Sequence, residues 1–229
     1  HVGYADIESA VPMDSSTLLR VYSMTKPIAS TIVMTLFEEG KLRLFDPIAK
    51  YLPEFENVQV LEEDASGSHK YIAPNRPPTI RDLLTHTAGF SYHFAEDTPV
   101  AKMYDVSSFQ TDSLRSLVSA LSSVPLACHP GTKWHYGLNI DVAACVAEVV
   151  ADKPFQDLLA ERLLGPLSMN DTYFTVPKGH RSRIATMYGA MDIGLPEFSL
   201  TRSAELYAEQ EELKVIDAQS GSPCDHEGF

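Results

Sequence analysis

The sequence predicts an α/β fold of the α+β kind, with a strand near its start and a largely helical middle. Two observations support this prediction. Residues 2–8 fit a strand, whereas apolar residues recur at helical spacing in several segments between residues 27 and 164. The 229 residues, 44% of them hydrophobic, are enough to bury a sizeable core in one to two domains.

The first predicted helix follows Ser23. Pro27 is tolerated only in the first turn of a helix, where its missing N–H would have no partner. Gly40 supplies a stop. Between these two residues, apolar side chains repeat at four-residue spacing, at Ile28, Ile32 and Leu36, with Val33 and Phe37 beside them. Ser23 is therefore predicted to lie at or just before the helix N-terminus.

Further elements follow between residues 41 and 170. A short helix is predicted to start at Asp46-Pro47 and to end at Pro53, and the polar residues 57–78 are predicted to form an exposed excursion of the chain. Thr79 and Asp82 form a capping pair for the next helix. Helices are predicted over residues 79–88, 112–122, 139–152 and 154–164.

Ser23 and Lys26 form an S-x-x-K pattern. Residues three apart share one face of a helix, so the hydroxyl and the amine can meet in one pocket, as a nucleophile with a basic neighbour requires. The N–H groups and the dipole at the start of a helix also favour an alkoxide or an oxyanion. The pattern therefore predicts acyl chemistry. The alternative is an ordinary serine cap followed by a solvated lysine.

Tyr136 is a second candidate catalytic residue. It lies in a turn with a cluster of aromatic and polar side chains, residues 130–137, directly before a strongly apolar predicted helix. Functional side chains favour such rigidly supported loops. A phenol beside a lysine ammonium is stabilised as its phenolate and could act as a general base. The alternative is a tyrosine that anchors the loop through its ring.

Four segments, in this order, resemble the β-lactamase-related serine hydrolases. This group comprises class C β-lactamases, penicillin-binding DD-peptidases, and family VIII carboxylesterases with related acyltransferases. The segments are V-Y-S-M-T-K-P (21–27), T-I-R-D-L-L-T-H-T-A-G-F (79–90), P-G-T-K-W-H-Y-G-L-N-I-D-V (130–142) and G-P-L-S-M-N-D-T-Y-F (165–174). The resemblance covers about residues 1–190.

This resemblance implies a β-lactamase/transpeptidase-like fold, in which an antiparallel sheet is flanked by helices and a helical lobe is added. Residues 1–40 and about 175–229 would be parts of the α/β lobe. Residues 41–174 would form the mainly helical lobe. The fold is expected to be incomplete in this chain.

The resemblance also implies roles for individual residues. Ser23 would be the acylated nucleophile, Lys26 its proton partner, and Tyr136 the base that activates the serine and later protonates the leaving group. Tyr92 is similar to the pocket tyrosine of the esterase and acyltransferase branch, and its alternative is a plain core aromatic. Asn139 is a candidate substrate-binding residue, with helix capping as its alternative.

One departure from the family pattern favours ester substrates. The β-lactamase and peptidase branches usually carry Tyr-x-Asn, whose amide holds a β-lactam or peptide. Here the position two after Tyr136 is Leu138, which cannot supply that hydrogen bond. We therefore expect a serine hydrolase, or an acyltransferase, that acts on carboxylic esters. The alternatives are a β-lactamase or DD-peptidase, and an inactive homologue that serves as a binding scaffold.

A second departure concerns the ends of the chain. The family's third motif, of Lys-Thr-Gly or His-x-Gly type, should follow well after Tyr136, and we do not find it. The helix and strand that precede the family's first matching strand are also absent. We interpret the chain as the middle of a longer protein.

Composition limits the cofactors and partners. The net charge of −13 argues against nucleic acid, and no run of about 18 apolar residues is present to span a membrane. The histidines and cysteines lack zinc-site spacing, so we predict no metal and no cofactor. His86, near the end of a predicted helix, is expected to be structural. The expected partner is a small-molecule ester or amide substrate, and the oligomeric state stays open.

Cysteine usage bears on the compartment. The three cysteines are odd in number and widely spaced, which favours free thiols in a reducing compartment. We interpret the protein as cytoplasmic. A periplasmic or secreted location stays open because a signal peptide could precede residue 1.

Overall fold

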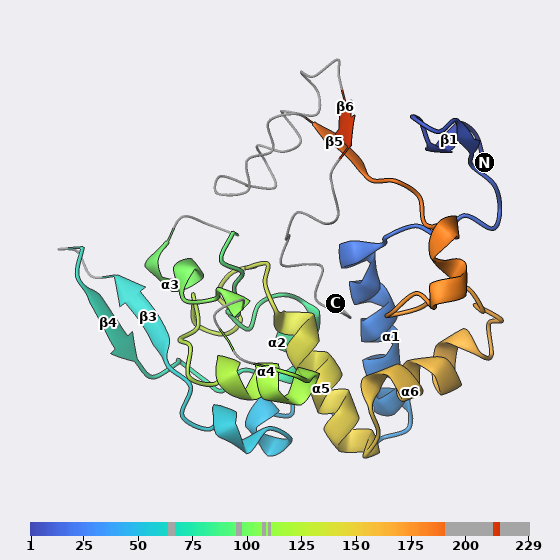
Figure 1. The fold of residues 1–229 in the computed structure, drawn as a ribbon. Helices are drawn as coiled ribbons and strands as arrows, with labels where there is room; N and C mark the ends of the chain where they lie inside the picture. Colours follow the sequence, from blue (N-terminus) through green and yellow to red (C-terminus); the bar gives the residue numbers. More distant parts are fainter. Residues whose placement is uncertain (64–66, 95–97, 107–108, 110, 191–212, 216–229) are drawn as a thin grey trace. The chain divides into compact units, whose positions relative to one another are not determined.

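The computed structural model describes residues 1–63, 67–94, 98–106, 109, 111–190 and 213–215. The chain divides into two compact units. Figure 1 colours the chain along its sequence, from blue at the N-terminus to red at the C-terminus. The first combines residues 1–25 with the described part of 164–229, and the second is residues 26–163. The predicted lobe boundaries near residues 40 and 174 stay a prediction.

The first unit contains short antiparallel strand pairs. Strand β1 (Tyr4–Asp6), inside the predicted strand, pairs with β2 (Val11–Pro12), and β5 (Tyr188–Ala190) pairs with β6 (Leu213–Val215). Two 3₁₀ helices, η1 (Tyr22–Met24) and η6 (Lys178–Arg183), also belong to it.

Leu18 joins the beginning and the end of this unit. Its N–H donates to Arg183 O (2.8 Å), and its carbonyl accepts from the Ala185 N–H (2.9 Å). Asp171 holds the Arg183 guanidinium through both carboxylate oxygens, and this pairing lowers the pKa of the Asp171 carboxyl to about 2.

The second unit is built mainly from helices. Helix α5 packs against α2, α4 and α6, as Figure 1 shows for the yellow helix. The bounds are α1 (Thr25–Glu38), α2 (Ile80–Leu84), α3 (Pro99–Lys102), α4 (Leu114–Leu121), α5 (Asn139–Ala151) and α6 (Phe155–Leu159), with 3₁₀ helices η2 (Ile48–Lys50) and η3 (Pro53–Phe55) and a π-helix η5 (Ala160–Leu164). No helix in the described part of the chain is long and apolar enough to span a membrane.

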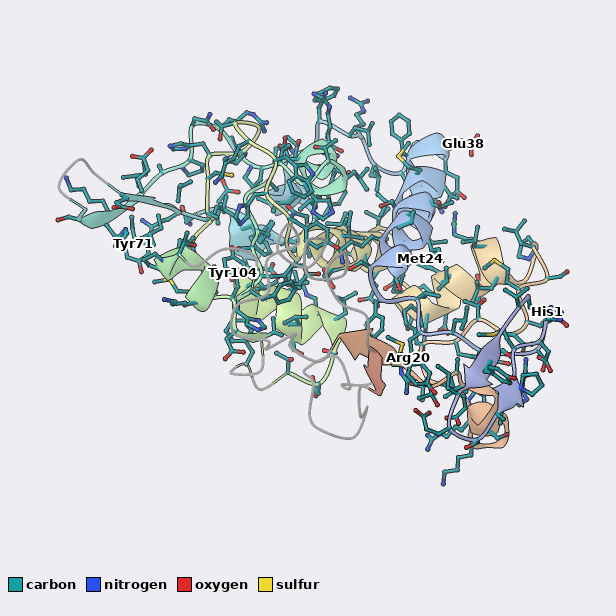
Figure 2. The ribbon with its side chains drawn as sticks, turned by 90° about the horizontal axis from the view of Figure 1, so that it is seen from above. His1, Arg20, Met24, Glu38, Tyr71 and Tyr104 are labelled. Atoms are coloured by element: carbon teal, nitrogen blue, oxygen red, sulfur yellow. The ribbon has the colours of Figure 1, made fainter. Side chains whose placement is uncertain are left out.

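Helix α1 confirms the first helix prediction. Figure 2 labels Met24 just before it and Glu38 at its end. Ile32, Val33 and Leu36 are fully buried, because the four-residue spacing places them on one face. Phe37, which was expected on this face, is 39% exposed.

The exposed excursion predicted over residues 57–78 contains two strands that the sequence did not indicate. Strands β3 (Val60–Glu63) and β4 (His69–Ile72) form an antiparallel hairpin with Val60 opposite Ile72. Val60 is buried, and the Leu61 N–H donates to Leu126 O (3.1 Å). Charged side chains on short edge strands protect them from pairing with other chains, and the same charges make such strands look like loops in sequence.

The predicted helix over residues 79–88 is shorter than expected. Thr79 and Asp82 form the predicted capping box, but α2 ends at Leu84. The reason lies in the turn that follows, where His86 (φ 53°) and Gly89 (φ 100°) leave the helical region. This turn sends the chain toward Tyr92.

An ion pair between the exposed Arg76 side chain and the buried Asp82 carboxylate fixes the turn that precedes Tyr136. Arg76 donates to both carboxylate oxygens of Asp82 at 2.6 and 2.8 Å, and Asp82 is only 4% exposed. Burial by itself would raise the pKa of Asp82, but Arg76 and Thr79 outweigh it and hold the pKa below its ordinary value. Gly131 (φ 81°) passes so close to the Arg76 guanidinium that a Cβ would collide with it.

A second close approach lies at the start of α5. A Cβ at Gly137 would collide with Phe90 O and lie 2.5 Å from Ser91 Cα. The His135 N–H donates to His86 O (2.7 Å), which ties the same two segments together. The segment before α5 therefore runs in backbone contact with residues 86–91.

Asp82→Asn is expected to destabilise the protein by about 2–4 kcal/mol, because it leaves Arg76 without its buried anionic partner. The free energy of urea unfolding measures this. The difference from wild type should shrink below pH 4, since a carboxyl with a lowered pKa loses its contribution as the pH falls below the unfolded value of about 3.9. Glu161→Gln breaks an exposed pair with Lys153 and should cost less than about 1 kcal/mol. Equal costs for the two variants would contradict this account.

Gly137→Ala is expected to destabilise the protein by about 3 kcal/mol, because the added methyl group meets backbone atoms that cannot rotate away. Urea unfolding followed by circular dichroism measures this. Gly179→Ala is the matched control, since nothing lies within 4 Å of its Cβ position. A Gly137→Ala variant as stable as the control would show that residues 90 and 137 are not in close contact.

Candidate active site

The structure brings three of the predicted site residues together in the second unit. The Lys26 Nζ lies 5.0 Å from the ring centroid of Tyr136 and 5.4 Å from that of Tyr92. The two tyrosine rings are 5.6 Å apart at 49°. The electron-rich faces of aromatic rings attract a cation at these distances. An amine from α1 and two phenols from separate loops therefore form one cluster.

More aromatic rings surround Tyr136. The imidazole of His86 lies 4.8 Å from the Tyr136 ring at 34°, and the indole of Trp134 stacks on it at 5.8 Å and 25°. Phe94 stacks on Tyr92 at 4.8 Å and 12°. Tyr92 is half-buried, and its role in a substrate pocket stays a prediction.

Ser23 lies in η1, which directly precedes α1, and it is exposed. The residue before it, Tyr22, has a φ of 41°, a strained conformation for a residue with a bulky side chain. Such strain costs of order 1–3 kcal/mol and is concentrated at functional sites. Ser23 belongs to the first unit, and only two residues separate it from Lys26 in the chain.

Asn139 is the first residue of α5 and is fully buried. Leu138 occupies the N-cap position, so the alternative of Asn139 as a helix cap is wrong. The Asn139 amide nitrogen lies 3.1 Å from His86 Nδ1 and 3.3 Å from both Phe90 O and His135 O. Its Oδ1 is buried without a hydrogen-bond partner among the described residues. Substrate binding by Asn139 stays a prediction.

His86 lies beside this cluster, with its imidazole 4.8 Å from the Tyr136 ring and 6.1 Å from the Trp134 ring. Burial, with a smaller contribution from the charge of Lys26, lowers the pKa of His86 to about 4. The imidazole is therefore neutral at neutral pH.

A hydrogen bond between Ser91 and His135, which sequence reasoning missed, links the loops that carry the two tyrosines. His135 Nε2 lies 2.8 Å from Ser91 Oγ, and both residues are buried. Ser91 Oγ donates to Tyr92 O (3.1 Å), so His135 is the donor toward Ser91. Each of these residues directly precedes one of the tyrosines, and that position is the signal that could have revealed the pair.

Asp141, in the first turn of α5, is a further residue that the sequence did not single out. Burial raises the pKa of its carboxyl, and the positive charge of Lys26 opposes this rise. Asp141 is therefore part of the electrostatic surroundings of Lys26.

Within the described ranges, no group of three or more His, Cys, Asp or Glu residues could hold a metal ion. Cys128 and Cys145 are buried and form no disulfide within the described residues, and Cys224 lies outside them.

Chemically, the cluster combines a phenol, which can give and accept a proton, with an ammonium group over its ring face. The neutral His86 adds no charge to it. This arrangement can support proton transfer to and from a substrate or a nucleophile.

The chain is similar to several known proteins. The beta-lactamase family matches residues 1–210. Protein Rv1367c of Mycobacterium tuberculosis is 38% identical over 82% of this chain and 46% of its own length. Esterase EstB of Burkholderia gladioli is 32% identical over 85% of this chain and 50% of its own length. The chain thus spans about half the length of these relatives.

The fold is similar to that of a solved structure, Simvastatin Synthase (LovD) from Aspergillus terreus. The TM-score is 0.72 at 23% identity, over 94% of this chain and 51% of that one. The β-lactamase/transpeptidase-like fold, here with helices and small antiparallel sheets, is therefore confirmed. The family match and these likenesses confirm the resemblance seen in the sequence, and the chain belongs to the beta-lactamase family.

Proposed function

We propose that the protein is a serine hydrolase that cleaves carboxylic esters, or transfers their acyl group, through an acyl-Ser23 intermediate. The observation that carries this proposal is the Lys26 ammonium 5.0 Å from the Tyr136 ring, with Ser23 three residues before that lysine. Esterase EstB among the similar proteins supports an ester reaction in general.

The proposed reaction is a double displacement. Tyr136, as a phenolate stabilised by the Lys26 ammonium, accepts the proton of the Ser23 hydroxyl while Ser23 Oγ attacks the ester carbonyl carbon. The bond from that carbon to the alcohol oxygen then breaks, and Tyr136 returns the proton to the alcohol. Water, or a second alcohol, then gives its proton to Tyr136 as its oxygen attacks the carbonyl carbon of acyl-Ser23. The bond from that carbon to Ser23 Oγ breaks, Tyr136 returns the proton to Ser23 Oγ, and an acid or a new ester is released.

The residues after Tyr136 favour esters over β-lactams and peptides. Leu138 is 5% exposed and offers no side-chain hydrogen bond to a substrate amide. The amino group of Asn139, one residue later, is occupied by protein acceptors. An ester needs no such amide-binding group. Nitrocefin turnover comparable to ester turnover would overturn this preference.

Ser23→Ala is expected to lower kcat for p-nitrophenyl acetate by about a thousandfold or more, because the nucleophile is lost. The natural protein at full length is the enzyme to assay, beside Ser30→Ala as a matched control on α1. A fluorophosphonate should add its mass to Ser23 in wild type. Equal rates for wild type and Ser23→Ala, or labelling elsewhere, would refute the nucleophile assignment.

Tyr136→Phe is expected to lower kcat by about 10²–10⁴-fold, because it removes the proton acceptor. It keeps the ring that contacts Lys26, His86 and Trp134, so the urea midpoint should stay close to that of wild type. Tyr71→Phe on the exposed hairpin strand is the control and should leave kcat unchanged. If Tyr136→Phe retains full activity, the phenol is not the base.

A further inference from the structure

We propose that His86 and Asn139 form a positioning pair for the Tyr136 phenol, in which Asn139 holds His86 as its Nε2–H tautomer and the imidazole supports the Tyr136 ring. The role of Tyr136 in this inference rests on the proposed function. The hydrogen-bond arrangement of His86 and Asn139 is independent of the proposed function.

The orientation of the Asn139 amide follows from its neighbours. Two backbone carbonyls, Phe90 O and His135 O, each lie 3.3 Å from the same amide atom. Carbonyl oxygens only accept hydrogen bonds, so the atom that faces them must be the amino group. The opposite orientation would place three oxygens together in a fully buried position, where the repulsion is poorly screened.

The tautomer of His86 follows from that orientation. His86 Nδ1 lies 3.1 Å from the Asn139 amino group, which can only donate. Nδ1 must therefore be the acceptor. A neutral imidazole that accepts at Nδ1 carries its proton on Nε2.

The same contact disfavours a charged His86. Protonation would place an Nδ1–H against the hydrogens of the Asn139 amino group. Burial and the charge of Lys26 act in the same direction and lower the pKa of His86 to about 4. The Tyr136 and Trp134 rings also face this imidazole, and neither carries a positive charge. The cation next to the Tyr136 ring is therefore Lys26, not His86.

The pair fixes Tyr136 in two ways. The imidazole packs against the Tyr136 ring with centroids 4.8 Å apart. The Asn139 amino group also binds the carbonyl of His135, the residue before Tyr136, and the His135 N–H donates to His86 O at 2.7 Å. The side chain and the backbone of the tyrosine are thus both held by groups that do not themselves react, so His86 and Asn139 are positioning residues.

Nitrogen-15 NMR of the histidine rings of this chain tests the tautomer directly. We expect His86 Nε2 protonated and Nδ1 unprotonated, without change from pH 8 to pH 5. An Nδ1–H tautomer, or an imidazolium at pH 6, would overturn the pairing. This measurement needs no catalytic turnover, so its result is independent of the proposed function.

His86→Asn tests the support of the ring. Asparagine tolerates the left-handed backbone at residue 86 (φ 53°), and its side-chain oxygen can accept from Asn139 as Nδ1 does, so this variant removes mainly the imidazole face. We expect kcat for p-nitrophenyl acetate to fall about 10–100-fold, since a misplaced catalytic group costs up to about 10²-fold. KM should change less than about twofold, because His86 does not bind the substrate.

His69→Gln, on the exposed strand β4, is the matched control and should leave kcat and KM unchanged. An unchanged kcat in His86→Asn, or an equal fall in the control, would overturn the positioning role. If Ser23→Ala is as active as wild type, the proposed function fails and the role in catalysis falls with it. The NMR spectrum then still decides whether Asn139 fixes the tautomer.

Discussion

The candidate site depends on the backbone contact between residues 86–91 and the segment that leads into α5. Gly137 makes this contact possible, because any Cβ there would collide with Phe90 O. Asn139 makes it favourable, because its amino group binds carbonyls from both segments. Two chain segments some 45 residues apart thus reach a distance at which Tyr136 can pack on His86 and Tyr92. Without a glycine at position 137 and a buried donor at position 139, the Tyr136 ring would not have its present neighbours.

The ion pair of Arg76 and Asp82 supports the loop that leads to Tyr136, at Gly131. A buried carboxylate is stabilised only by good geometry, and Asp82 has it, with Arg76 and both the N–H and hydroxyl of Thr79 as donors. Asp82 thus takes part in the capping box of α2 and also binds Arg76, whose guanidinium lies against Gly131. The pair therefore couples the start of α2 to the loop that carries Tyr136.

Local signals in the sequence predicted local structure well. Pro27 and the spacing of Ile32 and Leu36 predicted α1, and Thr79 with Asp82 predicted the capping box, because these effects act within one turn of a helix. The β3–β4 hairpin was missed, since its polar edge strands satisfy the compositional criteria for a loop.

Contacts between distant segments were the part that sequence reasoning could not reach. Asn139 was considered as a cap or a substrate ligand, whereas its partners lie 49 and 53 residues earlier in the chain. Ser91 and His135 are 44 residues apart and follow no spacing rule.

In the proposed reaction, the proton moves between the Ser23 hydroxyl and the Tyr136 phenol beside the Lys26 ammonium. A nearby base that could itself take up the proton would compete. The hydrogen bond from Asn139 to His86 Nδ1 removes that competition, because the Nδ1 lone pair is already used. The imidazole then supports the Tyr136 ring instead of acting as a base. The partners of Asn139 therefore matter for the proposed chemistry as much as for the fold.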